Sequence, residues 1–416
     1  MAEGTGTHGT EPAGHAVGVK GPHLAGRRFC SKAPSSEDLE TPFGFLVWLL
    51  GGAGLAGLVA AVATSPSAAQ AAAGQDWPPF VLVTGLLLIG LVADDDGLFA
   101  AAGYQLARVA KGGGVLFVGA VVLIGAVTAL LNLDTSVAFL TPVLIYTARS
   151  RGGGEAPLLY GCLLLSNAGS LFLTGSNLTN LIVLGHVHLS GAAFISRMWA
   201  PALAALVVTA VVVAAFESRA LRVDAGELTR PDRPVLGLGL AAVVGATVLV
   251  VTLRSPALPV AIVGIVAIGI RLVGRRDQPR HVLGVLSAPT LIGLFGVAVA
   301  LGTLGRAWSG PATLLAHLDL WGTAVFAAVA SVLLNNLPAA SLLAARVPGR
   351  PYALLVGLNL GPNLFVTGSL AWLLWLRSAR NAGAKPSIAT ASRIGALAVP
   401  LSIAAALGVL ALTGSR

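Results

Sequence analysis

Long apolar stretches separated by short polar segments make up the chain from Pro42 to its C-terminus. Each stretch is about 20 residues long, the length that a helix needs to cross a hydrocarbon core about 30 Å thick. The stretches are continuous and rich in Ala, Leu and Val, whereas the strands of a membrane barrel alternate apolar and polar positions. The pattern predicts an all-α polytopic membrane protein with about 10–12 transmembrane segments.

Two of the apolar stretches are interrupted by the same polar tripeptide. Residues 171–176 read LFLTGS, and residues 364–369 read LFVTGS. Upstream of each lies the sequence LLN, which ends at Asn132 in the first case and at Asn335 in the second, followed by a proline and an arginine-containing loop. The same order of features in both halves predicts two membrane repeats, residues 42–230 and 231–416.

The basic residues predict how the repeats are oriented. With a cytoplasmic N-terminus and an outer loop at residues 64–78, alternating crossings place roughly 20 of the 26 Lys and Arg residues on the cytoplasmic side, as the positive-inside rule requires. The two interrupted helices then run in opposite directions. This predicts inverted repeats with broken helices and re-entrant hairpins, which meet near the bilayer midplane in transporters of that design.

Residues 1–41 differ from the rest of the chain. They are polar and rich in glycine, and they lack the apolar core of a signal peptide. We expect them to form a disordered cytoplasmic tail ahead of a multi-pass protein of the plasma (inner) membrane.

Composition and charge agree with this class. Hydrophobic residues make up 56% of the chain and charged residues 10%, against about 25% charged residues in soluble domains. The net charge of +9 is explained by the cytoplasmic loops, so the lipid bilayer is an expected partner and a nucleic acid is not. The two cysteines form no CxxC pair, and the chain has neither a phosphate-binding GKS/T loop nor a His/Glu/Asp constellation. We therefore expect no metal, no cofactor and no enzymatic activity.

Polar residues gather around the two interruptions. Asparagines flank both TGS tripeptides, and an amide in lipid is costly unless a partner satisfies it. Our preferred interpretation is a shared cavity for substrate, in which broken helix ends and freed backbone groups bind the solute and its coupling ion. Close packing of helices through small residues is the alternative.

Acidic residues add two further expectations. Asp134, in LLNLDTSVAFLTP, lies between two apolar stretches, and acids at such positions usually bind ions or carry protons. A structural cap for the helix that begins at Thr135 is the alternative, and both roles can coexist. The second copy of LLN is followed by Asn336 rather than by an acid. Residues 94–96 read DDD and are expected to form a solvated cluster at the cytoplasmic end of the second span.

Five segments carry a resemblance to a known family: GLVADDDGLFAAAGYQLARVA, LLNLDTSVAFLTPVLIYTAR, SNAGSLFLTGSNLTNLIV, LLNNLPA and LNLGPNLFVTGSLAWLLWLR. In these the chain resembles the ArsB-type arsenite efflux permeases of the ion transporter superfamily, which also includes Na⁺/H⁺ antiporters and dicarboxylate and citrate permeases. The resemblance implies an inverted-repeat fold and export driven by the proton gradient. It is compatible with a separate ATPase subunit and with a homodimer.

The interrupted segments and the resemblance together define the candidate site. Its substrate-binding and ion-binding residues are Asn132, Asp134, Thr135, Asn167, Thr174, Gly175, Ser176 and Asn177 in the first half, and Asn335, Asn336, Asn359, Gly361, Asn363, Thr367, Gly368 and Ser369 in the second.

The resemblance implies a secondary active transporter that exports arsenite or antimonite in exchange for protons. Arsenous acid is a neutral polyol at neutral pH, which suits amides, hydroxyls and backbone groups. A dicarboxylate needs positive charge or helix N-termini, and no Lys or Arg falls in the predicted core. The alternatives are a permease for dicarboxylate-like or citrate-like anions, a Na⁺-coupled permease and a Na⁺/H⁺ antiporter.

Overall fold

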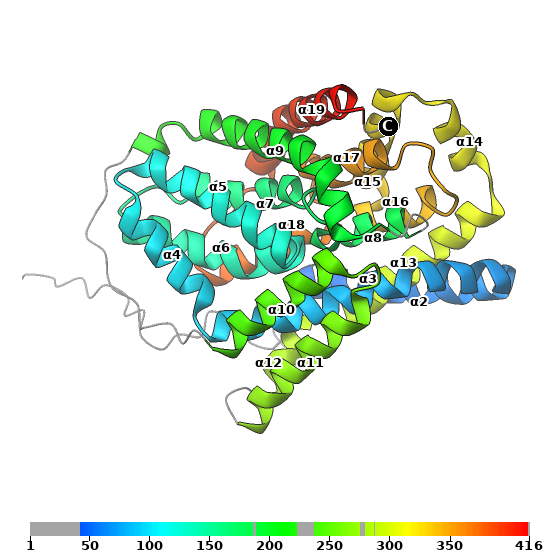
Figure 1. The fold of residues 1–416 in the computed structure, drawn as a ribbon, viewed down its shortest axis with the longest axis horizontal. Helices are drawn as coiled ribbons and strands as arrows, with labels where there is room; N and C mark the ends of the chain where they lie inside the picture. Colours follow the sequence, from blue (N-terminus) through cyan, green and yellow to red (C-terminus); the bar gives the residue numbers. More distant parts are fainter. Residues whose placement is uncertain (1–41, 186–188, 223–236, 275–278, 287, 415–416) are drawn as a thin grey trace, which may run out of the picture.

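Helices account for all the regular secondary structure in the computed structural model, which describes residues 42–185, 189–222, 237–274, 279–286 and 288–414 (Figure 1). The predicted tail lies outside these ranges. The first half contains α2 (Pro42–Thr64), α3 (Pro66–Asp95), α4 (Leu98–Val109), α5 (Gly113–Leu130), α6 (Leu133–Ser150), α7 (Ala156–Gly169), η1 (Thr174–Ser176), α8 (Leu178–Leu184), α9 (Gly191–Phe216) and η2 (Ala220–Arg222).

The second half has a similar order of elements. It contains α10 (Leu238–Thr252), α11 (Ala257–Val273), α12 (Pro279–Leu286), α13 (Ala288–Ala307), α14 (Gly310–His317), α15 (Leu320–Leu334), α16 (Asn336–Leu343), α17 (Pro351–Leu360), η3 (Gly361–Leu364), α18 (Leu370–Asn381) and α19 (Ile388–Leu412). The prediction of an all-α fold is confirmed for the described residues.

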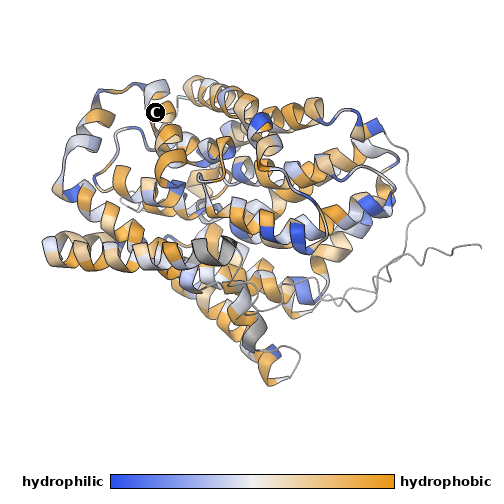
Figure 2. Ribbon diagram, turned by 180° about the vertical axis from the view of Figure 1, so that it is seen from behind, coloured by the Kyte–Doolittle hydropathy of each residue, from blue (hydrophilic) through white to orange (hydrophobic). Residues whose placement is uncertain are grey.

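The helices are apolar enough for a membrane. Five in the described part of the chain are long and apolar enough to cross one, among them α3, α5, α9 and α19, and five shorter apolar helices of 10–17 residues accompany them. Large apolar side chains such as Val118, Val122, Val207 and Val211 are exposed on the outer faces of α5 and α9, and apolar residues cover much of the outside in Figure 2. Such faces suit contact with lipid.

Matching elements of the two halves exchange partners. Helix α6 of the first half packs on α18 of the second half, and α16 of the second half packs on α8 of the first half. Likewise α3 packs on α11 while α13 packs on α2, and α9 and α19 pack on each other. This exchange is that of two repeats related by a pseudo-twofold axis. The boundaries at residues 42, 230 and 416 stay a prediction.

The helices form two groups in Figure 1. We call α2, α3 and α10–α13 the frame, and α5–α9 together with α15–α19 the core. The frame meets the core where α3 contacts α6 and α8 and where α13 contacts α16. The hairpins and broken helices that the sequence singles out therefore lie in the core.

The prediction of an outer loop at residues 64–78 is wrong. These residues form the first part of α3, which runs unbroken through Pro78 and Pro79. Pro66 occupies the first turn of the helix, where its missing N–H costs nothing, and an alanine-rich run follows it. Helix propensity therefore outweighs the polar and proline residues that suggested a loop.

Close backbone contact holds α2 against α13, and this gives a first prediction. A Cβ added to Gly54 would lie 2.1 Å from the Gly293 carbonyl oxygen. Gly54→Val is expected to force the helices apart and to cost about 1–3 kcal/mol of stability, measured as a lower melting temperature in detergent. Gly52→Val is the control, because nothing lies within 4 Å of a Cβ there. Equal melting temperatures for the two variants would contradict the packing described.

Candidate functional site

Both TGS tripeptides lie at interruptions between helices. In the first half α7 ends at Gly169, and Thr174–Ser176 forms the short η1 before α8 begins. In the second half α17 runs into η3, after which residues 365–369 lead to α18. The residue directly before each following helix, Asn177 or Ser369, has an extended backbone. Two helices are therefore broken where the sequence predicts.

Side chains satisfy the backbone groups that the breaks release. The Asn180 Nδ2 donates to the carbonyl oxygens of Ser170 at 2.7 Å and of Leu173 at 3.0 Å. The Trp372 indole Nε1 donates to the Pro362 carbonyl oxygen at 2.8 Å. These partners remove much of the cost of unpaired backbone inside an apolar surrounding.

The two LLN sequences also have matching conformations. Asn132 and Asn335, with φ of 136° and 75°, are the non-glycine residues of the described chain with positive φ. Each caps the helix that follows, because its Oδ1 accepts from the amide of Thr135 at 2.7 Å in the first half and of Leu337 at 3.4 Å in the second. With ψ of 173° at Asn132 and 145° at Asn335, both lie outside the left-handed helical region, in a backbone conformation that is strained for a non-glycine residue, while Asn caps helices well.

The second hairpin is docked onto the TGS segment of its own half. The Asn336 amide donates to the Gly368 carbonyl oxygen at 2.8 Å, and the Asn335 Nδ2 donates to the Thr367 carbonyl oxygen at 3.2 Å. The hairpin tip and the break are thus built as one unit.

Asn359 joins the broken helices of the two halves. Its Oδ1 accepts from the Ser170 hydroxyl at 2.8 Å, the Asn177 Nδ2 at 2.6 Å and the Thr179 hydroxyl at 3.3 Å. Its Nδ2 donates to the Asn180 Oδ1 at 2.9 Å. All five side chains are buried. We call these five residues the asparagine cluster.

A second amide pair lies next to this cluster. The Asn167 Nδ2 donates to the Asn363 Oδ1 at 2.8 Å, and the Asn363 Nδ2 donates to the Leu164 carbonyl oxygen at 3.0 Å. The Asn167 Oδ1 is buried without a hydrogen bond. The pair adds a further link between α7 and η3.

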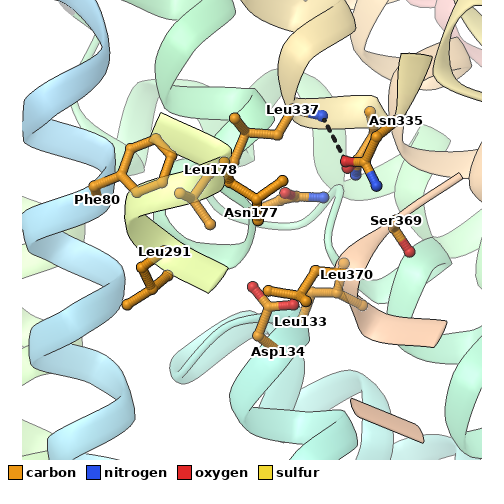
Figure 3. A pocket seen from close by; sticks show the side chains of 12 residues that line it. Phe80, Leu133, Asp134, Asn177, Leu178, Leu291, Asn335, Leu337, Ser369 and Leu370 are labelled. Atoms are coloured by element: carbon orange, nitrogen blue, oxygen red, sulfur yellow. Dashed lines mark hydrogen bonds between the residues drawn. The ribbon is translucent and has the colours of Figure 1, made fainter. Parts of the chain in front are cut away.

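A small pocket lies between the halves (Figure 3). Asp134 and Asn177 line it from the first half, and Asn335, Asn336 and Ser369 line it from the second. Its volume of about 20 Å³ has room for about one water molecule. The other lining residues are apolar: Phe80, Leu133, Leu178, Leu291, Leu294, Leu337 and Leu370.

Four helix N-termini converge on this pocket. The first residues of α6, α8, α16 and α18 all line it, and α6 corresponds to α16 as α8 does to α18. Helix N-termini carry partial positive charge and free N–H groups. The pocket therefore favours a solute that is rich in oxygen lone pairs, although no Lys, Arg or His lines it.

Several buried polar atoms at the pocket or beside it have no hydrogen bond. They are the Ser369 Oγ, which belongs to a lining residue, and the Asn132 Nδ2 and Thr135 Oγ1 on the first turn of α6. Asp134, only 6% exposed, forms no ion pair with a described residue. Groups of this kind are costly unless a ligand satisfies them.

The structure places the candidate residues in three environments. Five line the pocket: Asp134, Asn177, Asn335, Asn336 and Ser369. Two more, Asn132 and Thr135, lie beside it. The remaining candidates contact other parts of the core or its edge. Asn167, Asn359 and Asn363 make buried amide contacts, and the hydroxyls of Ser176 and Thr367 donate to the carbonyl oxygens of Ala129 and Val332 respectively. Gly175, Gly361 and Gly368 are closely packed, and Thr174 lines a different cavity.

The frame supplies a wall of the pocket that sequence reasoning missed. Phe80 of α3 and Leu291 and Leu294 of α13 face the polar residues of the core. Apolar residues on apolar helices give no sign of such a position. Their place at the pocket follows only from the packing of frame against core.

The acidic run at the end of α3 is paired, so the expectation of a solvated cluster is wrong. The Arg271 guanidinium lies 2.5 Å from an Asp96 oxygen and 3.5 Å from an Asp95 oxygen. The other Asp96 oxygen accepts from the Gly239 amide at 2.7 Å. Arg271 is 8% exposed, so this ion pair joins α3, α10 and α11 away from bulk water.

Comparison with known proteins identifies the family. The sequence model of the citrate transporter family (CitMHS) matches residues 45–375. This protein is a member of the citrate transporter family. Curated relatives include the arsenical pump membrane proteins of Escherichia coli and Yersinia enterocolitica, each 27% identical over 334 residues, which cover 72% of this chain and 78% of the relative.

Among solved structures, this family member is similar to the YdaH transporter of Alcanivorax borkumensis. The two share 15% sequence identity with a TM-score of 0.49, and the match covers 92% of this chain and 90% of that one. The family and the apolar helices together make the protein a multi-pass membrane transporter.

Proposed function

We propose that this transporter exports arsenite or antimonite across the plasma membrane in exchange for protons. The observation that carries the proposal is the lining of the pocket: three amides, one hydroxyl and one carboxyl group from both halves, without a basic residue. Arsenous acid is a small neutral solute with three hydroxyl groups. Amide, hydroxyl and helix-end N–H groups can bind such a solute without compensating a charge.

The names of the relatives support this substrate. The matched proteins of Escherichia coli and Yersinia enterocolitica are arsenical pump membrane proteins. In the proposed cycle Asp134 binds the coupling proton, because it is the acid that lines the pocket. Because substrate and proton share one small space in this proposal, binding of one disfavours the other, which is the coupling that an exchanger needs.

A second candidate is a permease for citrate-like or dicarboxylate anions. Two observations favour it: the family is named for citrate transport, and four helix N-termini converge on the pocket. Helix N-termini can bind a carboxylate without arginine. The absence of basic residues from the pocket lining supports the neutral solute instead.

Uptake into everted membrane vesicles that contain the protein tests the proposal. We expect arsenite to accumulate when a proton gradient is imposed and to leak out when an uncoupler collapses it. Parallel vesicles receive citrate in place of arsenite, or a Na⁺ gradient in place of the proton gradient, and vesicles without the protein give the background. Accumulation of citrate without arsenite, or accumulation of arsenite driven only by Na⁺, would overturn the proposal.

A further inference from the structure

Asp76 is a buried acid of α3 that the pocket does not use. It is 1% exposed, and neither carboxyl oxygen makes a hydrogen bond. It is absent from the ion pairs formed by the described residues. A carboxyl group enclosed in this way is costly when charged, and acids within membrane helices usually have a function.

Arg306, a cation in the surroundings of Asp76, is hydrogen-bonded to other groups. The positive charge of the Arg306 guanidinium, on α13, interacts electrostatically with the Asp76 carboxyl group, and the Ser341 hydroxyl of α16 faces that group. However, Arg306 donates to the Gln75 Oε1 at 2.5 Å and to the Gly302 carbonyl oxygen at 2.9 Å. The guanidinium thus stays close to Asp76 without neutralising it by direct contact.

No other charge in the described residues lies on the helices packed at this level. The described ranges of α2, α8, α10 and α16 contain no Asp, Glu, Lys, Arg or His. Arg271 of α11 meets α3 at its other end, at Asp95, and Arg108 of α4 follows that same end. Arg280 and His281 belong to α12, which precedes the start of α13, whereas Arg306 lies at the end of α13. Asp134 of α6 lines the pocket together with Phe80 of α3, which follows Asp76 by four positions.

A cavity of about 510 Å³ lies beside this acid. Gln75 and Arg306 line it, together with Arg254 and Ser255 from the loop between α10 and α11 and Thr174 from the first broken helix. A space of this size with polar groups in its wall has room for water. Gln75, the chain neighbour of Asp76, and Arg306 both lie at the wall of this cavity.

The helix that contains Ser341 also begins at the pocket. Asn336 and Leu337 line the pocket at the N-terminus of α16, and Ser341 follows five positions later. Aligned at LLN, Asp134 of the first hairpin corresponds to Leu337 of the second, which has no acid there. Asp76 lies beside α16, whose own hairpin lacks an acid.

We propose that Asp76 is a second proton-binding group of the transport cycle, which receives its proton through the cavity beside Arg306 and is coupled to the pocket through α16. This inference rests on the proposed function for its substrate and direction. The carboxylate takes up one proton, which neutralises it while Arg306 remains on Gln75, and it releases that proton when the core moves against the frame. Arg306 balances the charge of the deprotonated state.

Three assays on purified protein in proteoliposomes test the role of Asp76. The first measures arsenite accumulation driven by a proton gradient, and the second measures exchange of labelled for unlabelled arsenite at equal pH, which needs no net proton movement. The third records the infrared band of protonated carboxyl groups that appears when the pH of a film of these proteoliposomes is lowered. The variants are Asp76→Asn and the control Asp319→Asn, which changes an exposed helix cap to another good cap.

For Asp76→Asn we expect at least about a tenfold loss of accumulation, exchange within about twofold of the unaltered protein, and loss of one carboxyl band. Asp319→Asn is expected to match the unaltered protein in all three. Accumulation at the unaltered level in Asp76→Asn would overturn the inference, as would loss of exchange together with accumulation, since that result makes Asp76 structural. If the unaltered protein neither accumulates nor exchanges arsenite, the proposed function fails, and the infrared band alone decides whether Asp76 binds a proton.

Discussion

Asp134→Asn is expected to abolish proton-driven arsenite accumulation while leaving the protein folded in the membrane. The acid lines the pocket, is 6% exposed and forms no ion pair with a described residue, so its removal breaks no salt bridge. Asparagine keeps the shape and can still bind a hydroxyl group, but it cannot take up a proton. We expect a loss of at least about tenfold in gradient-driven accumulation in vesicles.

Asp134→Glu and a measurement of folding separate mechanism from structure. The glutamate variant keeps a carboxyl group in the pocket and is expected to regain part of the activity. Both variants are expected to show the melting temperature and membrane yield of the unaltered protein. Full activity of Asp134→Asn would remove this acid from the mechanism; it is not the cap of α6 either, since Asn132 has that position.

The second large effect is expected for Asn359→Leu, through stability. Leucine removes the acceptor shared by Ser170, Asn177 and Thr179 and the donor to Asn180. Each polar group left buried without a partner costs about 1–3 kcal/mol, so several such groups lower the free energy of unfolding by about 3 kcal/mol or more. A clear drop in melting temperature in detergent, with reduced yield from membranes, is the expected result.

The matched control for this variant is Asn381→Leu. Asn381 is the last residue of α18 and is exposed, so its replacement leaves no buried group unsatisfied. A melting temperature for Asn359→Leu equal to that of the control would show that the asparagine cluster does not hold the halves together.

Local sequence patterns predicted the fold class and both interruptions. The repeated LLN and TGS segments could be recognised because their backbone needs are local: a positive φ at Asn132 and Asn335, and helix ends at Gly169 and Leu360. Asparagine, glycine and serine favour such positions wherever they occur. The signal lies in the residues themselves and needs no knowledge of the tertiary structure.

Long-range partners could not be predicted in this way. The sequence places asparagines near each break but does not pair Asn359 with Asn177, which lies 182 positions away. The acidic run at the end of α3 has the pattern of a solvated cluster, and only the packing of α11 brings Arg271 to it. The sequence pattern places Asp76 in a loop between two apolar stretches, whereas in the structure the same residues belong to α3.

The asparagine cluster also has a kinetic consequence. Its hydrogen bonds and those of the Asn167 and Asn363 pair join the broken helix of one repeat to that of the other. The two broken helices are therefore expected to move as one rigid body. In the proposed exchange cycle the two broken helices then move together, both in the stroke that carries arsenite out and in the return stroke that carries the proton in. Movement of one broken helix without the other would have to break several buried amide hydrogen bonds, at about 1 kcal/mol or more each. States in which only one of the two broken helices has moved are thereby made rare.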